Sequence, residues 1–155
     1  MNETAQKIII RQLEWNDQEL EQILEIDALC FNEYDAYTLE DYQRWFNFNP
    51  DLCLVAVIGG RIAGDVISRT VEGRAELASM ATHPSYRRRG VAESLLAETV
   101  CRIKALGIHQ IDIEVRKTNF IGLSFWKKMG FEVIGEHPGF YGDGEDAWQM
   151  RKNIS

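Results

Sequence analysis

The stretch LASMATHPSYRRRGVA, residues 77–92, joins a predicted strand to a predicted helix through a turn that contains proline. We expect the helix to begin at Gly90, directly after three consecutive arginines. A helix N-terminus presents unpaired backbone N–H groups and the positive end of the helix dipole, and the two together bind phosphates. Glycine lets a phosphate approach the backbone, and Ala92 keeps the first turn small. The stretch therefore predicts a phosphate site, with a merely solvated basic loop as the alternative.

The segments around this stretch show strand and helix periodicity in turn. Leu52–Ile58 and Arg61–Thr70 are strand-like and flank Gly59-Gly60, a pair typical of two-residue hairpin turns. Farther upstream, Thr38 is followed three residues later by Asp41, a capping-box pattern that predicts a helix N-terminus. The full set of expected strands is Lys7–Leu13, Leu52–Ile58, Arg61–Thr70, Glu76–Thr82, Gln110–Val115, Phe131–Gly135 and Ala147–Arg151. The expected helices are Asp17–Phe31, a segment from Thr38 to Asn49, Gly90–Leu106 and Phe120–Met129.

This order is strand, two helices, three strands, helix, strand, helix and two strands. It predicts a mixed α/β fold in which helices cover a sheet. The sequence shows no internal repeat, low-complexity tract or linker, so we expect residues 1–155 to form a single domain.

The composition excludes several classes of protein. Of 155 residues, 45% are hydrophobic and 26% are charged, as in ordinary globular proteins. The formal net charge of −7 argues against nucleic-acid binding, which needs a basic surface, and is compatible with a cationic ligand such as an amine. The opening residues, MNETAQK, are polar, and no apolar run reaches membrane-spanning length. We therefore expect a cytoplasmic protein that binds neither nucleic acid nor membrane.

Three widely spaced cysteines, Cys30, Cys53 and Cys101, each have apolar neighbours. We expect small buried side chains in a reducing compartment, with a reactive thiol as the alternative. No cysteine or histidine pair has the spacing of a zinc site, so we expect no metal ion. The histidines, to which we assign no role in a site, are His83, His109 and His137.

Four segments together resemble the GNAT superfamily of acetyltransferases. Residues 77–92 look like its acetyl-CoA signature, in which Arg/Gln-x-x-Gly-x-Gly/Ala follows a strand and a turn with proline. The resemblance continues through IEVRKTN (113–119) and FWKKMGF (125–131) to EDAWQM (145–150). This last combination is similar to the branch that acetylates protein N-termini, including ribosomal-protein-alanine and archaeal enzymes. The resemblance implies the GNAT fold, a mixed and mostly antiparallel sheet flanked by helices and splayed between its fourth and fifth strands.

The resemblance also implies where acetyl-CoA binds. Met80 and Thr82, with Ala81 between them, would hold the pantetheine and place the acetyl carbonyl through main-chain hydrogen bonds. Arg87 stands at the Gln/Arg position of the signature. Asn119 would contact the cofactor, and it is also a good N-cap for the next helix, so both roles can hold. The residues implied to line the pyrophosphate through backbone amides are Arg88, Arg89, Gly90, Val91 and Ala92.

Glu114 is the candidate general base. Aminolysis of a thioester needs a neutral amine, and most amines are protonated near neutral pH. A carboxylate beside the amine can accept this proton, directly or through water. Strand alternation places Glu114 opposite Ile113 and Val115, and the family has its catalytic glutamate at this position. The alternative is a surface carboxylate paired with Arg116 or a lysine.

Trp126 departs from the family pattern, which usually has a tyrosine at this position to protonate the departing thiolate or to contact the cofactor. An indole N–H does not titrate usefully, so Trp126 cannot be a general acid, although it can pack against pantetheine or in the core. Either the thiolate leaves without help, or Tyr141 in the loop of the last hairpin serves as the acid. Local packing is the alternative for Tyr141.

The acceptor site is expected between the loop Phe31–Thr38 and the hairpin Pro138–Glu145. Phe31, Tyr34 and Tyr37 would supply aromatic walls there. The carboxylates expected to attract an ammonium group, unless they form a solvated edge, are Glu33 and Asp35. The first loop lacks the proline that the N-terminal acetyltransferase branch often has soon after the phenylalanine.

These observations predict an acetyl-CoA-dependent N-acetyltransferase, monomeric or homodimeric, that acts on the α-amino group of protein N-termini. A GNAT enzyme for a small amine or a lysine side chain is the first alternative. The second is a non-catalytic acetyl-CoA-binding module, which the exchange of the family tyrosine for Trp126 keeps open.

Overall fold

The computed structural model describes residues 6–155, and in this part of the chain seven strands form one sheet in the order β1-β2-β3-β4-β5-β7-β6. Neighbouring strands are antiparallel except for β4 and β5, which are parallel. The strands are β1 (Ile9–Gln12), β2 (Cys53–Ile58), β3 (Arg61–Val71), β4 (Arg74–Thr82), β5 (Gln110–Arg116), β6 (Glu132–His137) and β7 (Ala147–Asn153).

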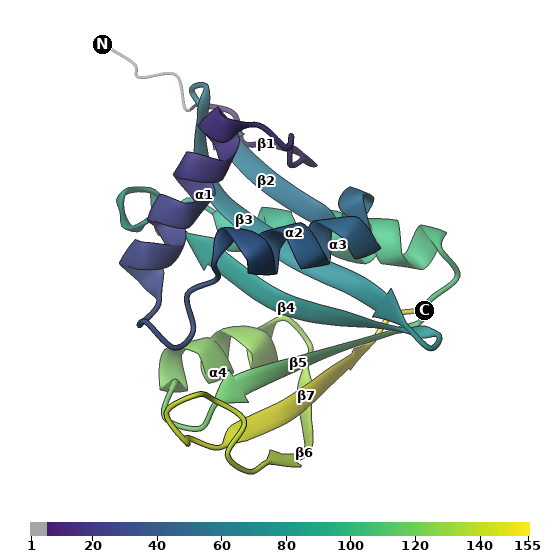
Figure 1. The fold of residues 1–155 in the computed structure, drawn as a ribbon. Helices are drawn as coiled ribbons and strands as arrows, with labels where there is room; N and C mark the ends of the chain where they lie inside the picture. The colour runs from purple at the N-terminus through teal and green to yellow at the C-terminus, as the bar shows by residue number, and fades with distance from the viewer. Residues whose placement is uncertain (1–5) are drawn as a thin grey trace.

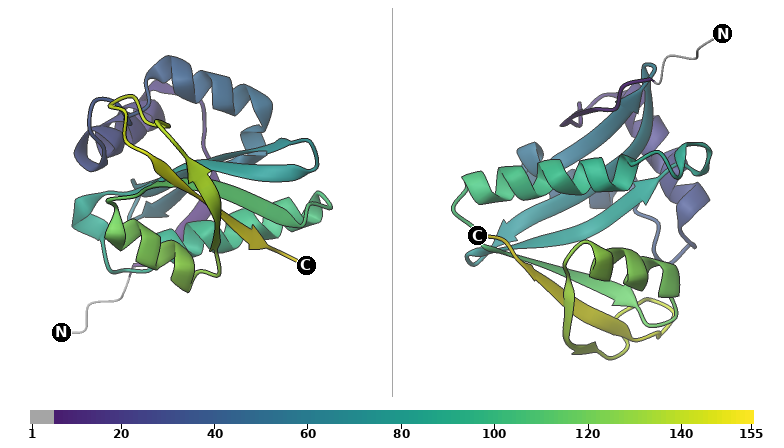
Figure 2. Two further views of the ribbon diagram at one scale, coloured as in Figure 1. Left: turned by 90° about the horizontal axis from the view of Figure 1, so that it is seen from below. Right: turned by 180° about the vertical axis from the view of Figure 1, so that it is seen from behind.

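Helices cover both faces of the sheet (Figure 2). The first pair, α1 (Asp17–Cys30) and α2 (Leu39–Phe48), buries Ile23, Ile26 and Tyr42 against one face. The second pair, α3 (Val91–Ala105) and α4 (Phe120–Lys128), packs on the other face. Because both faces are covered, β2 is buried along nearly its whole length, which explains its continuous apolar sequence.

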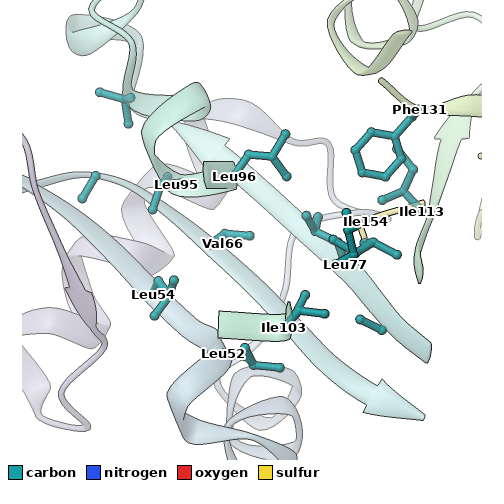
Figure 3. Close-up of a cluster of buried hydrophobic side chains, with 14 of the residues drawn as sticks. Leu52, Leu54, Val66, Leu77, Leu95, Leu96, Ile103, Ile113, Phe131 and Ile154 are labelled. Carbon is teal, nitrogen blue, oxygen red and sulfur yellow. The ribbon is translucent and has the colours of Figure 1, made fainter. Parts of the chain in front are cut away.

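The larger core lies under α3 (Figure 3). Leu95 and Ile103 of α3 are fully buried and meet Leu54 and Val66 of the sheet. Full burial of such a side chain contributes about 1.5–3 kcal/mol to folding. This packing fixes the direction of α3, and therefore the place of its N-terminus.

The sheet is splayed at the parallel pair. Ala75 pairs with Ile111 and Glu76 with Asp112, and no further pair joins β4 to β5 in the described chain. Beyond these residues the two strands diverge, as Figure 1 shows. The sheet and its splay between the fourth and fifth strands confirm the expected fold, and a gap with unpaired strand edges opens at its centre.

The expected order of elements is confirmed, and most ends differ by one to three residues. The capping box of Thr38 and Asp41 forms, and Gly59 and Gly60 both take positive φ in the hairpin turn. The apolar periodicity of the two helices predicts that Leu39 and Leu106 face inward, and this is wrong, because both lie at helix ends and are about half exposed. The opening strand is shorter than expected, and residues 1–5 of the polar opening segment lie outside the described residues.

The cysteine prediction holds for Cys53, which is buried, and is wrong for Cys101, which is exposed on α3. Cys30 is half-buried at the end of α1. Within residues 6–155, no helix is long and apolar enough to cross a membrane. The single-domain expectation stays a prediction.

Candidate active site

A cleft of about 920 Å³ opens where β4 and β5 separate. Its walls come from β4, β5, the loop between α1 and α2, and the loop between β6 and β7. Half of the side chains expected in the site line this cleft, whereas Glu33, Ala81, Thr82 and residues 87–92 do not. The expected residues that line it are Phe31, Tyr34, Asp35, Tyr37, Met80, Glu114, Asn119, Trp126 and Tyr141.

The inner edge of β4 offers free main-chain groups to this gap. The N–H of His83 donates to the carbonyl of Ala63 on β3, at 2.8 Å. Successive residues of a strand direct their main-chain groups to opposite edges, so Ala81 also faces β3, while Met80 and Thr82 face the gap. The Thr82 carbonyl accepts a hydrogen bond from the thiol of Cys30 at 3.2 Å. The main-chain roles of Met80 and Thr82 stay predictions, whereas Ala81 directs its main chain to β3 and its side chain is buried under α1 and α2.

The N-terminus of α3 lies at the end of the turn that follows β4. Gly90 is the N-cap, with φ of +79°, and no side chain of the described residues caps the first turn of the helix. Arg88 also has positive φ, and the side chains of residues 87–89 are exposed. Free N–H groups, a missing side chain and three cations fit a pyrophosphate. The side chain of Val91 is buried in the core, so the contact predicted for Val91 would involve its backbone N–H alone.

Glu114 projects from β5 into the cleft, and its side chain is 22% exposed. Ile113 and Val115 are buried on the other face, as alternation predicted. Burial raises the pKa of the Glu114 carboxyl, and His137 opposes this shift. The His137 Nδ1 lies 3.5 Å from the Glu114 Oε1. The partner of Glu114 is therefore His137, and not Arg116 or a lysine as in the alternative reading.

Arg116 joins the two loops at the mouth of the cleft. Its guanidinium donates to both carboxylate oxygens of Asp35 at 2.7 Å. It also donates to Asp143 at 2.9 and 3.1 Å, and to Glu145 at 2.6 Å. We call these four residues the Arg116 clasp. One cation faces three carboxylates, so the clasp keeps a negative charge over the cleft.

Tyr141 lies beneath the clasp, with the Arg116 guanidinium 4.1 Å from the centre of its ring. Burial raises the pKa of the Tyr141 hydroxyl to about 12. A neutral phenol that lines the cleft can donate a proton to a thiolate only if binding brings the two together. Across the mouth, Gly142 lies against Tyr34, where an added Cβ would come within 3.2 Å of the ring.

The remaining predicted residues divide between the site and its support. Asn119 caps α4 by accepting from the Gly122 N–H at 2.9 Å, and it also borders the cleft. Trp126 packs edge-on against Phe125 and Phe131 and reaches the cleft from the core side. Glu33 is exposed outside the lining of the cleft.

Two residues of the site were missed or misjudged from the sequence. His137 was assigned no role in a site, but it is the last residue of β6 and lies beside Glu114. Asp35 was expected to attract an ammonium group, but its carboxylate is held by Arg116. Strand alternation extended to His137 could have indicated that this side chain faces the cleft. The contact between Asp35 and Arg116 joins residues 81 positions apart, so it leaves no local signal in the sequence. Among residues 6–155, no group of three or more Asp, Glu, His or Cys side chains is placed to hold a metal ion.

Comparison with known proteins agrees with this geometry. An acetyltransferase of Sodalis glossinidius is 31% identical over 93 residues, which cover 60% of this chain and 66% of that protein, slightly less than two thirds of its length. An N-alpha-acetyltransferase of Saccharolobus solfataricus is 25% identical over 88% of both chains. The crystal structure of Ard1 from Thermoplasma volcanium superposes with a TM-score of 0.88 over 96% of this chain and 98% of that one, at 22% identity, which shows the same fold.

The match to the family is broad. The acetyltransferase (GNAT) family model aligns with residues 20–131, from the first turn of α1 to the residue before β6. This range contains the splayed strands, the turn before α3 and Glu114. The chain therefore belongs to the acetyltransferase (GNAT) family.

Proposed function

We propose that this protein transfers the acetyl group of acetyl-CoA to the α-amino group of a protein N-terminus, in the cytoplasm. The observation that carries the proposal is the splay between β4 and β5, which opens a cleft lined by an unpaired stretch of β4 and by the half-buried carboxyl of Glu114. The helix N-terminus at Gly90, which has no side-chain cap among the described residues, follows β4 in the chain. The relatives named N-alpha-acetyltransferase support the choice of acceptor.

Acetyl-CoA supplies an activated acetyl group on a thioester. We assign its pyrophosphate to the first-turn N–H groups of α3 around Gly90, with the exposed arginines at 87–89 adding charge. We assign its pantetheine arm to the free main-chain groups of Met80 and to the N–H of Thr82, whose carbonyl already accepts from the Cys30 thiol, because an extended amide chain can replace the missing strand partner. The Met80 N–H would also polarise the acetyl carbonyl, as in an oxyanion hole.

Glu114 would accept the proton that the amine loses as the new C–N bond forms. Burial favours this role because a raised pKa brings the carboxyl closer to the pH at which it works, so that it both ionises and holds a proton. Tyr141 would then give a proton to the thiolate. The thiolate of coenzyme A is a weak base, so this second transfer contributes less than the first.

The acceptor class follows from the mouth of the cleft. The Arg116 clasp fastens Asp35 to the last hairpin, and its surplus negative charge favours an approaching ammonium group. The cleft beneath it is lined by Phe31, Tyr34 and Tyr37. An entrance between two loops that Arg116 holds together suits the free end of an extended chain. Folded-protein lysines and small amines remain the competing acceptors that the experiment must separate.

The test compares the wild-type protein with Glu114→Gln, which keeps the size of the side chain and removes its basicity. Release of free thiol from acetyl-CoA is followed with N-terminal peptides, polyamines, amino sugars and Nα-blocked lysine peptides. We expect release with free α-amines, and about a 10²–10⁴-fold loss in Glu114→Gln with unchanged acetyl-CoA affinity. If the protein binds acetyl-CoA but releases no thiol with any amine, the proposed activity is wrong and the protein is an acetyl-CoA-binding module.

A further inference from the structure

His137 and Glu114 meet inside the cleft although they come from different strands. The imidazole Nδ1 of His137 lies 3.5 Å from the Oε1 of Glu114, and both side chains line the cleft. Rotation of a histidine ring about χ2 is soft, so a small turn shortens this separation to a hydrogen bond. The side chain of His137 is 54% exposed, whereas that of Glu114 is 22% exposed. Glu114 therefore lies inside the cleft, and His137 lies between Glu114 and solvent.

The register of the sheet explains how the two side chains meet. Ala147 on β7 pairs with Arg116 on one side and with His137 on the other. Two residues farther along β7, and therefore on the same face, Gln149 lies opposite Glu114. Directly opposed residues of antiparallel strands point to the same face. Because Ala147 carries only a methyl group, the imidazole can reach across β7 toward β5. The ring of Phe140, 5.1 Å away, supports the imidazole from the loop side.

Other charged groups near Glu114 are already engaged. Glu76 of β4 is bonded by Arg69, and Asp112 of β5 is bonded by Arg151. Both carboxylates oppose ionisation of Glu114. The remaining charged or titratable groups that line this part of the cleft are Arg74, which lies between Glu76 and Asp112, and Asp35, Arg116 and Tyr141 of the mouth. Within the described chain, His137 is the basic side chain that contacts Glu114.

We propose that His137 is a positioning residue that holds the Glu114 carboxylate in the cleft and passes its proton to solvent. The inference rests on the proposed function. As the amine nitrogen bonds to the acetyl carbon and the C–S bond breaks, the proton of the amine moves to Glu114. It then moves to the unprotonated Nδ1 of neutral His137, Nε2 of this half-exposed ring releases its own proton to water, and exchange of the Nδ1 proton with water restores the starting tautomer. Glu114 is thereby returned to its basic form for the next cycle.

The activity test uses His137→Gln and His137→Ala, with His109→Gln as the matched control. His109 bonds the Ile154 carbonyl and lies outside the cleft lining. We expect kcat to fall about tenfold in His137→Gln, the low end of general acid–base effects, with an unchanged KM for acetyl-CoA. The acidic limb of the pH profile should move to higher pH, because loss of the imidazole raises the pKa of Glu114 further. Added imidazole should restore the activity of His137→Ala.

A second measurement needs no acceptor. The carboxyl carbon of Glu114 is titrated by NMR in the wild-type protein and in His137→Gln. We expect the pKa of Glu114 to be higher in the variant. Identical titrations, or a rate and pH profile unchanged by His137→Gln while Glu114→Gln is inactive, would overturn the role of His137 and leave the proposed function intact. Failure of every acceptor with the wild-type protein would overturn the function, and the titration would still decide whether the two side chains are coupled.

Discussion

Replacement of Asp65 by asparagine should stabilise the protein at neutral pH. Asp65 lies on β3 beneath α1 and α2, and it is 1% exposed. The Tyr42 hydroxyl is 2.7 Å from the Asp27 Oδ1 and 3.3 Å from the Asp65 Oδ2. Asp27 also accepts from the Tyr37 N–H, at 2.9 Å. The second oxygen of Asp65 has no hydrogen-bond partner within the described residues.

One hydroxyl proton cannot serve two carboxylates. The shorter contact assigns the Tyr42 proton to Asp27, so Asp65 must donate a proton of its own to the Tyr42 oxygen. Burial, with the neighbouring charge of Asp27, raises the pKa of Asp65 well above its usual range. The folded state therefore holds a proton that the unfolded chain releases above about pH 4. The contribution of Asp65 to the free energy of unfolding is greatest below that pH and falls by about 1.4 kcal/mol per pH unit until its folded-state pKa is reached.

Asparagine keeps the shape, and its amide donates to the Tyr42 oxygen without taking up a proton. The free energy of unfolding of both proteins is measured with guanidinium from about pH 4 to about pH 8. The difference, Asp65→Asn minus wild type, should grow by about 1.4 kcal/mol per pH unit. Glu25→Gln, at an exposed carboxyl on α1, is the control and should show no such trend. A difference that stays constant with pH would refute a protonated Asp65.

Three further predictions concern the site and the thiols. Gly90→Ala puts a methyl group at an αL position, so we expect a loss of about 1 kcal/mol in the free energy of unfolding. Acetyl-CoA binding, measured by calorimetry, should weaken about tenfold. Unchanged binding would show that the pyrophosphate does not bind at this turn. Arg116→Gln releases the two loops, so the acceptor KM should rise about tenfold or more in steady-state kinetics while the KM for acetyl-CoA stays constant. In mass-spectrometric labelling, a thiol reagent should modify exposed Cys101 in the folded protein, but Cys53 only after unfolding, because burial also raises the pKa of Cys53 to about 12.

The sequence was sufficient for the order of elements because each depends on local periodicity and caps. The helix start at Thr38 and the Gly59-Gly60 turn need only neighbouring residues, and both form as predicted. The prediction of a phosphate site at residues 87–92 depends on local sequence in the same way. Element ends were less predictable, since Leu39 and Leu106 continue an apolar pattern past the point where the sheet covers them.

The site depended on long-range contacts that periodicity does not encode. Alternation placed Glu114 on the open face of β5, but its contact with His137 requires the register of three strands. The Arg116 clasp joins loops from opposite ends of the chain, so Asp35 was read as a free carboxylate. The Tyr42–Asp65 contact likewise arises only when α2 lies on β3.

The central claim is that the cleft between β4 and β5 delivers an acetyl group to a terminal amine. It is tested most directly by incubating the purified protein with ¹³C-acetyl-CoA and a peptide library in which every member has one free α-amine and one lysine. Tandem mass spectrometry then locates the label. The account predicts ¹³C-acetyl on the α-nitrogen, absent in Glu114→Gln; label on lysine alone, or on neither nitrogen while acetyl-CoA is bound, would contradict it.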